Sequence, residues 1–373
     1  MRTGYSQLPL HGGKAPRWLF ERMKRLAREI VCHLVAEYGA EGALQRLADP
    51  FWFQAFGCVL GFDWHSSGIT TTTCGAVKEG IKGLERDLGF FAAGGKGRVS
   101  RRTPEEIEIH CDRTGNDAAP LINASRLSAK VDSSALQDGY QIYHHAFFFT
   151  LSGRWCVVQQ GMNEGSGMAR RYHWLGDDST DFVDEPHAAI CCDHRGSTLN
   201  FVAHESEAAR MRVTELAAQP DRETEHVLTR LPELVMPRRH WVRHEDINPR
   251  YLKKILLKTY EQAPADFQSL LGIQGVGAKT LRALALTAEL IYGTPTSIRD
   301  PARFSFSHGG KDGTPYPVDL TTYDKTIDVL HTALGRAKID RSDKIDALKR
   351  LAKFTDRPVK GLPSGGLDRS SRS

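Results

Sequence analysis

Residues 270–280 read Leu-Leu-Gly-Ile-Gln-Gly-Val-Gly-Ala-Lys-Thr, and an apolar run without proline follows them. This pattern predicts a helix over residues 265–271, a tight turn at Gly275-Val276-Gly277 and a second helix over residues 279–292. A turn this tight needs positive φ and a backbone without a Cβ in the way, which glycine provides. Val276 is the apolar tip expected to hold the two helices together.

The amides at the start of the second helix form a natural anion site, because their N–H groups and the helix dipole both favour negative charge. We therefore expect the turn to hold one DNA phosphate through Gly275, Val276, Gly277, Lys279 and Thr280. Two other arrangements compete with it, an ordinary corner between helices and the phosphate loop of a nucleotide-binding protein. That loop needs a preceding strand and an adjacent Gly-Lys pair, whereas here a helix is expected first and Ala278 separates Gly277 from Lys279.

The order Leu-Leu-x-Ile-x-Gly-Val-Gly-x-Lys-Thr resembles the hairpin of the helix-hairpin-helix DNA glycosylases, in the endonuclease III-like branch that also cleaves the backbone. The resemblance extends through Gly293-Thr294-Pro295-Thr296 to Asp300. It implies that Lys279 attacks the sugar C1′ and that Asp300 assists. Gln274 stands where the family has proline, and the second helix is about one turn longer, which moves Asp300 by about 5 Å.

The opening Met-Arg-Thr-Gly-Tyr and the later Leu-Pro-Leu-His-Gly-Gly carry a second resemblance. Along its whole length the chain resembles a prokaryotic domain-of-unknown-function family, number 763. That resemblance implies no chemistry.

Length and composition predict a globular chain of two or three domains, since the chain has 373 residues, 40% of them hydrophobic and 25% charged. The strand and helix patterns predict an α+β fold. Residues 1–204 are expected to form a mixed domain with a sheet that contains a β-hairpin, with a substrate-reading or catalytic role. Residues 205–356 are expected to form a helical domain with the glycine turn, and residues 357–373 a disordered tail. The net charge of +5 permits a polyanionic partner such as duplex DNA.

The seven cysteines are scattered without a Cys-x-x-Cys, which indicates a reducing compartment. The chain therefore also lacks the four-cysteine iron–sulfur loop that many endonuclease III relatives carry. Charged residues interrupt the start of the chain, so no signal peptide is expected, and no stretch approaches the roughly 20 apolar residues of a membrane span. We expect a cytoplasmic, nucleoid-associated protein without cofactor, metal or membrane partner. The sequence names no protein partner.

A basic loop follows the glycine pair Gly94-Gly95. Its cations are Lys96, Arg98, Arg101 and Arg102, and we expect them to contact the phosphate chain of a nucleic acid. A merely solvated loop is the alternative.

The clearest strands are expected over residues 140–150 and 154–160, joined by a hairpin turn at Ser152-Gly153. A helix over residues 17–38 should end at Gly39, and a turn of hydroxyl residues at 70–73 should cap another over residues 74–88. Further helices are expected at residues 206–218, 224–230, 249–260, 319–337 and 342–354. Arg170-Arg171-Tyr172-His173-Trp174 suits either stacking on nucleic acid or a strand edge.

Asp132 and Asp138 precede these strands and suggest a metal-dependent nuclease, in which carboxylates hold Mg²⁺. The acid-x-Lys expected on the following strand is missing. Lys130 is a second candidate for an activated amine. Structural roles are expected for His144-His145 and for Cys191-Cys192-Asp193-His194, because adjacent ligands do not converge readily on one ion.

The leading hypothesis is a DNA-repair enzyme, a glycosylase or abasic-site lyase that forms a Schiff base on damaged or abasic duplex DNA. Its amine must be neutral, so Lys279 would need burial or cationic neighbours. Asp300 would stabilise positive charge on the sugar, and a lesion base would rotate out of the duplex. The rivals are the nuclease of Asp132 and Asp138, and a non-catalytic DNA-binding protein in which Lys279 only contacts a phosphate.

Overall fold

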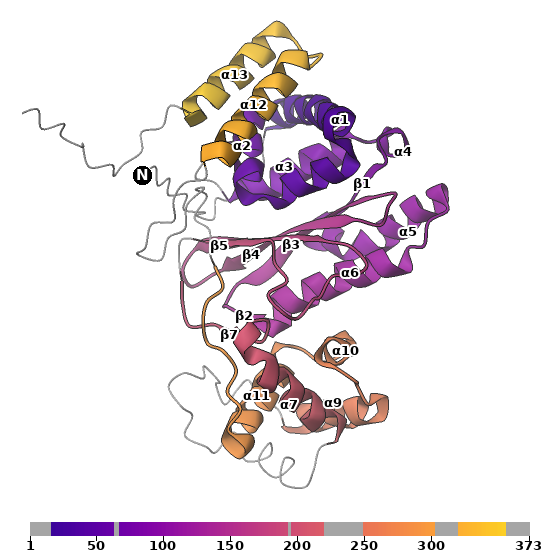
Figure 1. Cartoon of the computed structure of the whole chain (residues 1–373), viewed down its shortest axis with the longest axis vertical. Helices are drawn as coiled ribbons and strands as arrows, with labels where there is room; N and C mark the ends of the chain where they lie inside the picture. The colour runs from indigo at the N-terminus through magenta and orange to yellow at the C-terminus, as the bar shows by residue number, and fades with distance from the viewer. Residues whose placement is uncertain (1–15, 63–66, 193–194, 220–248, 303–319, 356–373) are drawn as a thin grey trace, which may run out of the picture.

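The computed structural model describes residues 16–62, 67–192, 195–219, 249–302 and 320–355. The fold is α+β, as predicted, with an antiparallel five-stranded sheet in the order β1-β3-β4-β5-β6 between layers of helices (Figure 1). The strands of this sheet are β1 (Phe90–Lys96), β3 (Gln141–Thr150), β4 (Trp155–Asn163), β5 (Met168–Gly176) and β6 (Ala189–Cys191).

The hairpin β3–β4 is the centre of the sheet and matches the two strands predicted from sequence. Thr150 N–H donates to Arg154 O at 2.9 Å, and Gly153 takes a positive φ of 81° in the turn. Phe147 and Phe149 face one core, whereas Ala146 and Phe148 face the other. Both faces of the sheet are covered by other parts of the chain, which explains why residues 146–149 of β3 are all apolar.

The upper face of the sheet, in the orientation of Figure 1, is covered by helices from the start of the chain. They are α1 (Arg17–Ala48), α2 (Pro50–Leu60) and α3 (Gly68–Gly80), followed by the short α4 (Glu85–Leu88). The prediction that α1 ends at Gly39 is wrong, because Gly39 only interrupts it with φ 73° and ψ 168°. The apolar stripe resumes beyond this kink, where Ala43, Leu44 and Leu47 are buried.

The hydroxyl residues predicted as a turn before a helix lie inside α3. Thr70 and Thr73 are fully buried, and Thr71 Oγ1 donates back to Gly68 O at 3.2 Å. Packing against the sheet and α1 therefore outweighs the low helix propensity of threonine.

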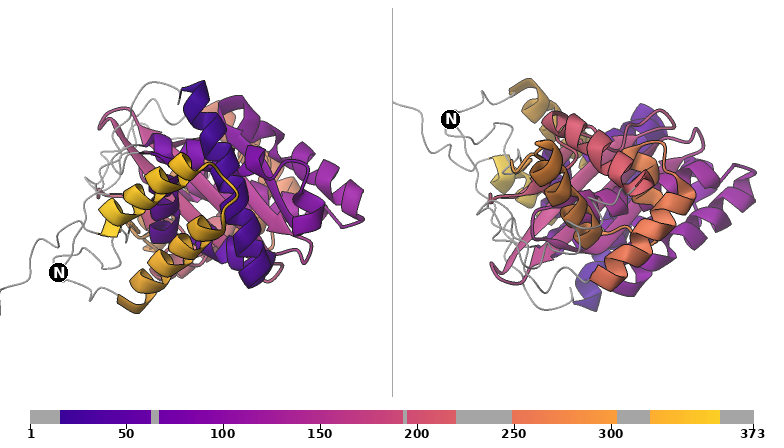
Figure 2. Two further views of the ribbon diagram at one scale, coloured as in Figure 1. Left: turned by 90° about the horizontal axis from the view of Figure 1, so that it is seen from above. Right: turned by 90° about the horizontal axis from the view of Figure 1, so that it is seen from below.

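Helices α12 (Leu320–Arg336) and α13 (Arg341–Thr355) come from the far end of the described chain, yet they share the upper core with α1, α2 and α3. Figure 2 shows them from above, lying over the first helices. Arg350 Nε donates to Val59 O at 3.0 Å, and Arg22 pairs with Asp343 at 3.1 Å. These two helices are thus separated from the other C-terminal helices.

The lower face of the sheet carries α5 (Thr103–Thr114) and α6 (Ala119–Lys130). Below them, the same core continues into α7 (Glu207–Ala218), α9 (Pro249–Gln262), α10 (Phe267–Gly272) and α11 (Ala278–Tyr292) (Figures 1 and 2). Connections between the layers are the short helices η1 (Gly97–Arg102), η2 (Val131–Ala135) and η3 (His204–Ser206), and the strand pair β2 (Leu136–Gln137) and β7 (Leu199–Asn200).

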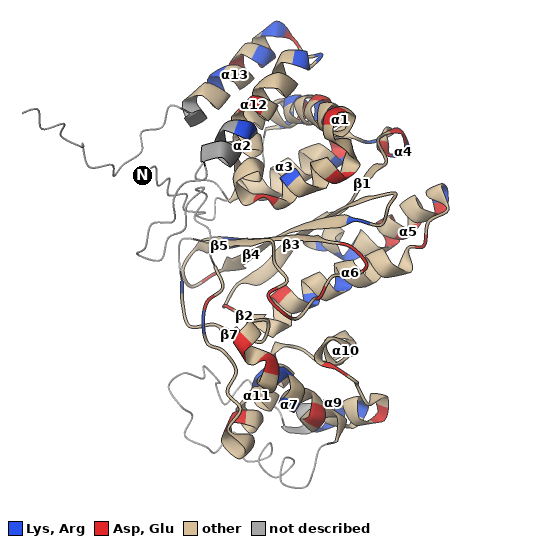
Figure 3. Cartoon of the chain, viewed as in Figure 1, with Lys and Arg blue, Asp and Glu red and all other residues tan. Residues whose placement is uncertain are grey.

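Lysine, arginine, aspartate and glutamate gather mainly on helices and loops, and the strands are largely uncharged (Figure 3). Within the described ranges no helix is long and apolar enough to cross a membrane. The helix predicted at residues 224–230 and the tail at residues 357–373 lie outside the described residues.

Candidate functional site

The glycine turn lies between α10 and α11, where the sequence places it. Asp266 caps α10 by accepting from Ser269 N at 2.7 Å, and Gly275 has a φ of 103° that only glycine adopts without strain. Val276 is fully buried, as are Leu270 and Leu281 on the two helices. The apolar tip therefore fixes one helix against the other.

The surface of the turn is open at Gly277. This residue precedes α11 in extended conformation (φ −135°), and a Cβ added to it would meet no atom within 4 Å. Lys279 is exposed, whereas Thr280 is buried. Of these predicted phosphate contacts, Thr280 can therefore take part only through its backbone amide.

The start of α11 is anchored to β2. Gln137 Nε2 donates to Ala278 O at 2.9 Å, and Arg282 Nε donates to Gln137 Oε1 at 2.8 Å. Lys279 follows Ala278 in sequence and Asp138 follows Gln137. The bond between Gln137 and Ala278 therefore joins the segment that carries Lys279, the candidate of the lyase hypothesis, to the segment that carries Asp138, a candidate of the nuclease hypothesis.

A buried arginine on β5 joins the remaining candidates. Arg170 pairs with Asp138 at 2.9 Å and with Asp300 at 2.7 Å, and all three side chains are at most 6% exposed. Tyr172 Oη donates to the same Asp138 oxygen at 2.7 Å. Burial alone would lower the pKa of Arg170, but the negative charges around it, led by Asp138, raise that pKa well above its usual value.

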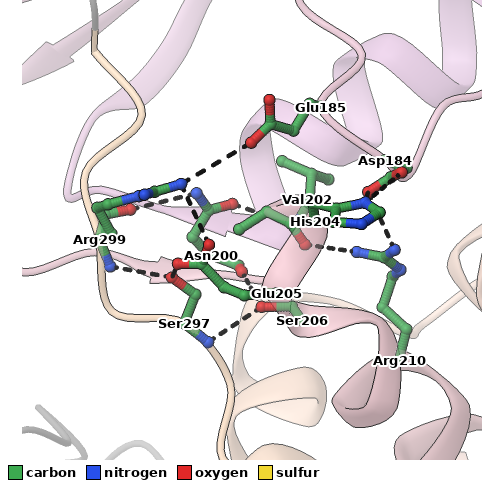
Figure 4. A network of polar contacts seen from close by, with 11 residues as sticks. Asp184, Glu185, Asn200, Val202, His204, Glu205, Ser206, Arg210, Ser297 and Arg299 are labelled. Atoms are coloured by element: carbon green, nitrogen blue, oxygen red, sulfur yellow. Dashed lines mark hydrogen bonds and ion pairs between the residues drawn. The ribbon is translucent and has the colours of Figure 1, made fainter.

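The segment that precedes Asp300 is held by polar contacts of Ser297 and Arg299 with η3 and its neighbouring loops (Figure 4). Ser297 Oγ donates to Glu205 at 2.7 Å, and Ser297 N donates to Ser206 Oγ at 3.0 Å. Arg299 lies between two acids, with Glu205 at 3.1 Å and Glu185 at 3.9 Å. The backbone leading to Asp300 is therefore fixed by its neighbours.

Asp132 is the centre of a second buried network. Its Oδ2 accepts from Gln159 Nε2 at 2.5 Å and from Trp174 Nε1 at 3.0 Å, and its Oδ1 lies 2.5 Å from His187 Nε2. Gln159 Oε1 in turn faces His145 Nδ1 at 3.0 Å. These contacts occupy both oxygens of a fully buried carboxylate.

The two carboxylates of the nuclease hypothesis therefore already serve as acceptors for protein groups. Asp138 accepts from Tyr140 N at 3.0 Å in addition to Arg170 and Tyr172. Over the described residues, no three His, Cys, Asp or Glu side chains are grouped as metal ligands would be. This arrangement favours a structural role for Asp132 and Asp138.

The two candidate amines differ in burial. Lys130 ends α6 and is half-buried, and this burial lowers its pKa. Lys279 is exposed, so the protein itself does not supply the burial that an amine nucleophile was expected to need. Bound DNA would have to cover it.

The basic loop predicted to contact nucleic acid forms the end of β1 and the helix η1. Lys96, Arg98, Arg101 and Arg102 are all exposed, and Arg102 pairs with Glu105 at 3.2 Å. This loop packs on β1, β3 and α5, whereas α10 and α11 pack on α6, α7 and η2. A DNA molecule would have to span these two regions to contact both.

Two sequence interpretations need correction. Arg170 and Arg171 are buried in an interior strand, so the stretch from Arg170 to Trp174 is neither a stacking surface nor a strand edge. His145 is hydrogen-bonded as expected, but neither ring nitrogen of buried His144 has a partner among the described residues. His187 is not predictable from its sequence neighbours, because its contact with Asp132 joins segments 55 residues apart.

The buried histidines predict a loss of stability in acid. Burial lowers the pKa of His144 to about 3, from 6.5 in an unfolded chain, so only the unfolded state gains a proton as the pH falls below 6.5. The contribution of the neutral imidazole is complete above pH 6.5 and should have fallen by about 2 kcal/mol at pH 5. Denaturant titrations of wild type and His144→Gln should therefore converge by this amount between pH 7 and pH 5. Parallel pH profiles would contradict the assignment.

Comparison with curated proteins and with solved structures gives no match at a significant level. The family model described as a protein of unknown function (DUF763) matches residues 4–318, which covers the sheet, its covering helices and the α10–α11 turn. Nearly the whole chain therefore carries the family pattern predicted from its first residues. The chain belongs to the DUF763 family.

Proposed function

We propose that this protein binds duplex DNA through the α10–α11 turn and acts on damaged or abasic DNA as a lyase. The open backbone at Gly277, next to the start of α11, is the observation that carries the proposal. A phosphate can approach a backbone without side chains closely, and the amides and dipole of a helix start favour its charge. The buried Val276 gives the turn the rigidity that such a contact needs.

The amine best placed to reach DNA at this turn is Lys279, which lies on the first turn of α11 and is exposed. It would add to C1′ of the open-chain abasic sugar, and loss of water would give a protonated imine. Removal of a C2′ proton then breaks the C3′–O bond, and the phosphate leaves with the electron pair. Hydrolysis of the imine frees the lysine.

Lys130 is the alternative nucleophile, because its pKa is already lowered by burial. It immediately precedes η2, which packs against α11. The carboxylate of Asp300 is already engaged by protein groups, since it accepts from Arg170 at 2.7 Å, Gly196 N at 3.0 Å and Ala302 N at 2.9 Å. These bonds oppose the catalytic role on the sugar that the resemblance implies. We therefore assign it a positioning role in the junction between the sheet and the 297–300 segment.

Gly277→Ala tests the DNA contact without straining the fold. The new Cβ would stand in open space at a φ that any residue adopts, so the fold should persist. A phosphate held closely at this backbone would be displaced, and we expect affinity for a duplex to fall about tenfold, the equivalent of one charge-assisted hydrogen bond. Fluorescence anisotropy at several salt concentrations measures the affinity and its salt dependence.

Gly272→Ala is the matched control. It lies at the end of α10, and its added Cβ would also meet no atom within 4 Å. It should bind DNA like wild type. Equal affinities of all three proteins would remove the turn from the DNA interface.

A further inference from the structure

A cavity of about 740 Å³ lies on the upper side of the sheet, on the other side from the α10–α11 turn. Its walls are the first turn of α1, the middle of α3 and the end of β1. The volume falls in the range of small-molecule sites, roughly 300–1,000 Å³. The α10–α11 turn, Lys279 and Lys130 do not belong to it, whereas Lys96 of the basic loop does.

The floor of the cavity is apolar and nearly closed to solvent. Phe148 and Ala146 contribute from β3, Ala92 from β1 and Cys74 from α3, and each is at most 4% exposed. Phe20 of α1 lies at the side, close to Gly75. Such a floor suits a flat, apolar ring.

The rim of the cavity is polar and carries two cations without an acidic partner. The acidic residues at the rim already form ion pairs with other lysines, since Glu21 pairs with Lys24 at 2.7 Å and Glu79 lies 3.9 Å from Lys82. Lys78 pairs with Glu106 at 2.6 Å. Within the described ranges, Arg17 and Lys96 take part in no ion pair. Lys96 Nζ lies 5.6 Å from the centre of the Tyr143 ring, and both cations are exposed, so an anionic ligand can approach them.

The end of β1 brings backbone to the same rim. Gly94 has a φ of 82°, and a Cβ there would lie 2.3 Å from His145 O, so no other residue fits. Glu106 accepts from Gly94 N at 2.7 Å and from Lys78, which also donates to Gly94 O at 2.9 Å. Gly94 is therefore held firmly beside the cavity, and Thr71 and Thr72 of α3 also line it.

We propose that this cavity binds a nucleotide, with the base on the apolar floor and the phosphate at Lys96 and Arg17. The bound nucleotide could come from two sources, because a free mononucleotide and an extrahelical nucleotide of DNA present the same base and phosphate groups. The proposal does not depend on the α10–α11 turn, because the two sites lie in different layers of the molecule.

Calorimetric titration with deoxyadenosine monophosphate, deoxyadenosine and inorganic phosphate tests the site. The monophosphate should bind more tightly than either part alone, and Lys96→Ala and Arg17→Ala should each weaken it about tenfold. Lys82→Ala removes the same charge from an exposed position outside the cavity and should have no effect. Gly277→Ala should also leave this binding unchanged, which separates it from the DNA contact.

Duplexes with and without one unpaired nucleotide separate the two sources. Tighter binding of the bulged duplex, lost in Lys96→Ala, with no binding of the monophosphate, would assign the cavity to an extrahelical nucleotide. Failure of both the monophosphate and the bulge to bind in a Lys96-dependent manner would overturn the proposal.

Discussion

Borohydride is expected to trap wild-type protein covalently on an abasic duplex, and Lys279→Ala is expected to yield no adduct. Reduction converts the transient imine into a stable amine, so trapping reports the nucleophile directly. Loss of a nucleophile should reduce the adduct by at least a hundredfold, whereas loss of one phosphate contact should cost roughly tenfold in affinity. Denaturing electrophoresis of labelled DNA, at protein concentrations that saturate binding, measures the adduct.

Lys130→Ala is the matched variant for this experiment. If it loses the adduct and Lys279→Ala retains it, the nucleophile is the half-buried amine at the end of α6. EDTA should leave trapping and strand cleavage unchanged, because an imine mechanism uses no metal. Cleavage that disappears with EDTA and returns with Mg²⁺ would support the nuclease hypothesis instead. No adduct with a wild-type protein that binds DNA would refute the lyase proposal.

Arg170→Met is expected to lower the free energy of unfolding by about 3–5 kcal/mol, because it leaves the buried carboxylates of Asp138 and Asp300 without their counter-ion. Methionine fills much of the same space, so the loss arises from charge rather than from a cavity. Urea titrations followed by circular dichroism measure the effect through the midpoint and slope.

Arg299→Met provides the control from the same junction. Arg299 also contacts two acids but is 63% exposed, so its replacement should cost less than about 1 kcal/mol. Combining Arg170→Met with Asp138→Asn and Asp300→Asn removes all three charges and should recover most of the lost stability. A cost at Arg170 as small as that at Arg299 would show that the ion pairs contribute little.

The sequence predicts the elements whose pattern is local. The run around Phe147 and Phe149 indicates a buried strand, and Ser152-Gly153 marks its turn. The glycines around Val276 predict the turn between α10 and α11 for the same reason, since their conformational demands act within a few residues.

The sequence does not predict which charges are buried together. Arg170 and Asp300 are 130 residues apart in the chain, and nothing in their neighbours distinguishes a buried pair from two exposed charges. The same holds for His187 and Asp132, which are 55 residues apart. The turn predicted at Thr70 and Thr73 is wrong for a related reason, because tertiary packing places both residues inside a helix that their propensity disfavours.

The packing of α12 and α13 on the first helices has a consequence for biosynthesis. The upper core needs Leu330, Leu334 and Leu351, which are translated after the sheet and the whole lower core. While the chain is still growing, α1 and α2 therefore expose an apolar surface that chaperones recognise. Helices α1 and α2 are thus expected to reach their final packing only after α12 and α13 have been translated.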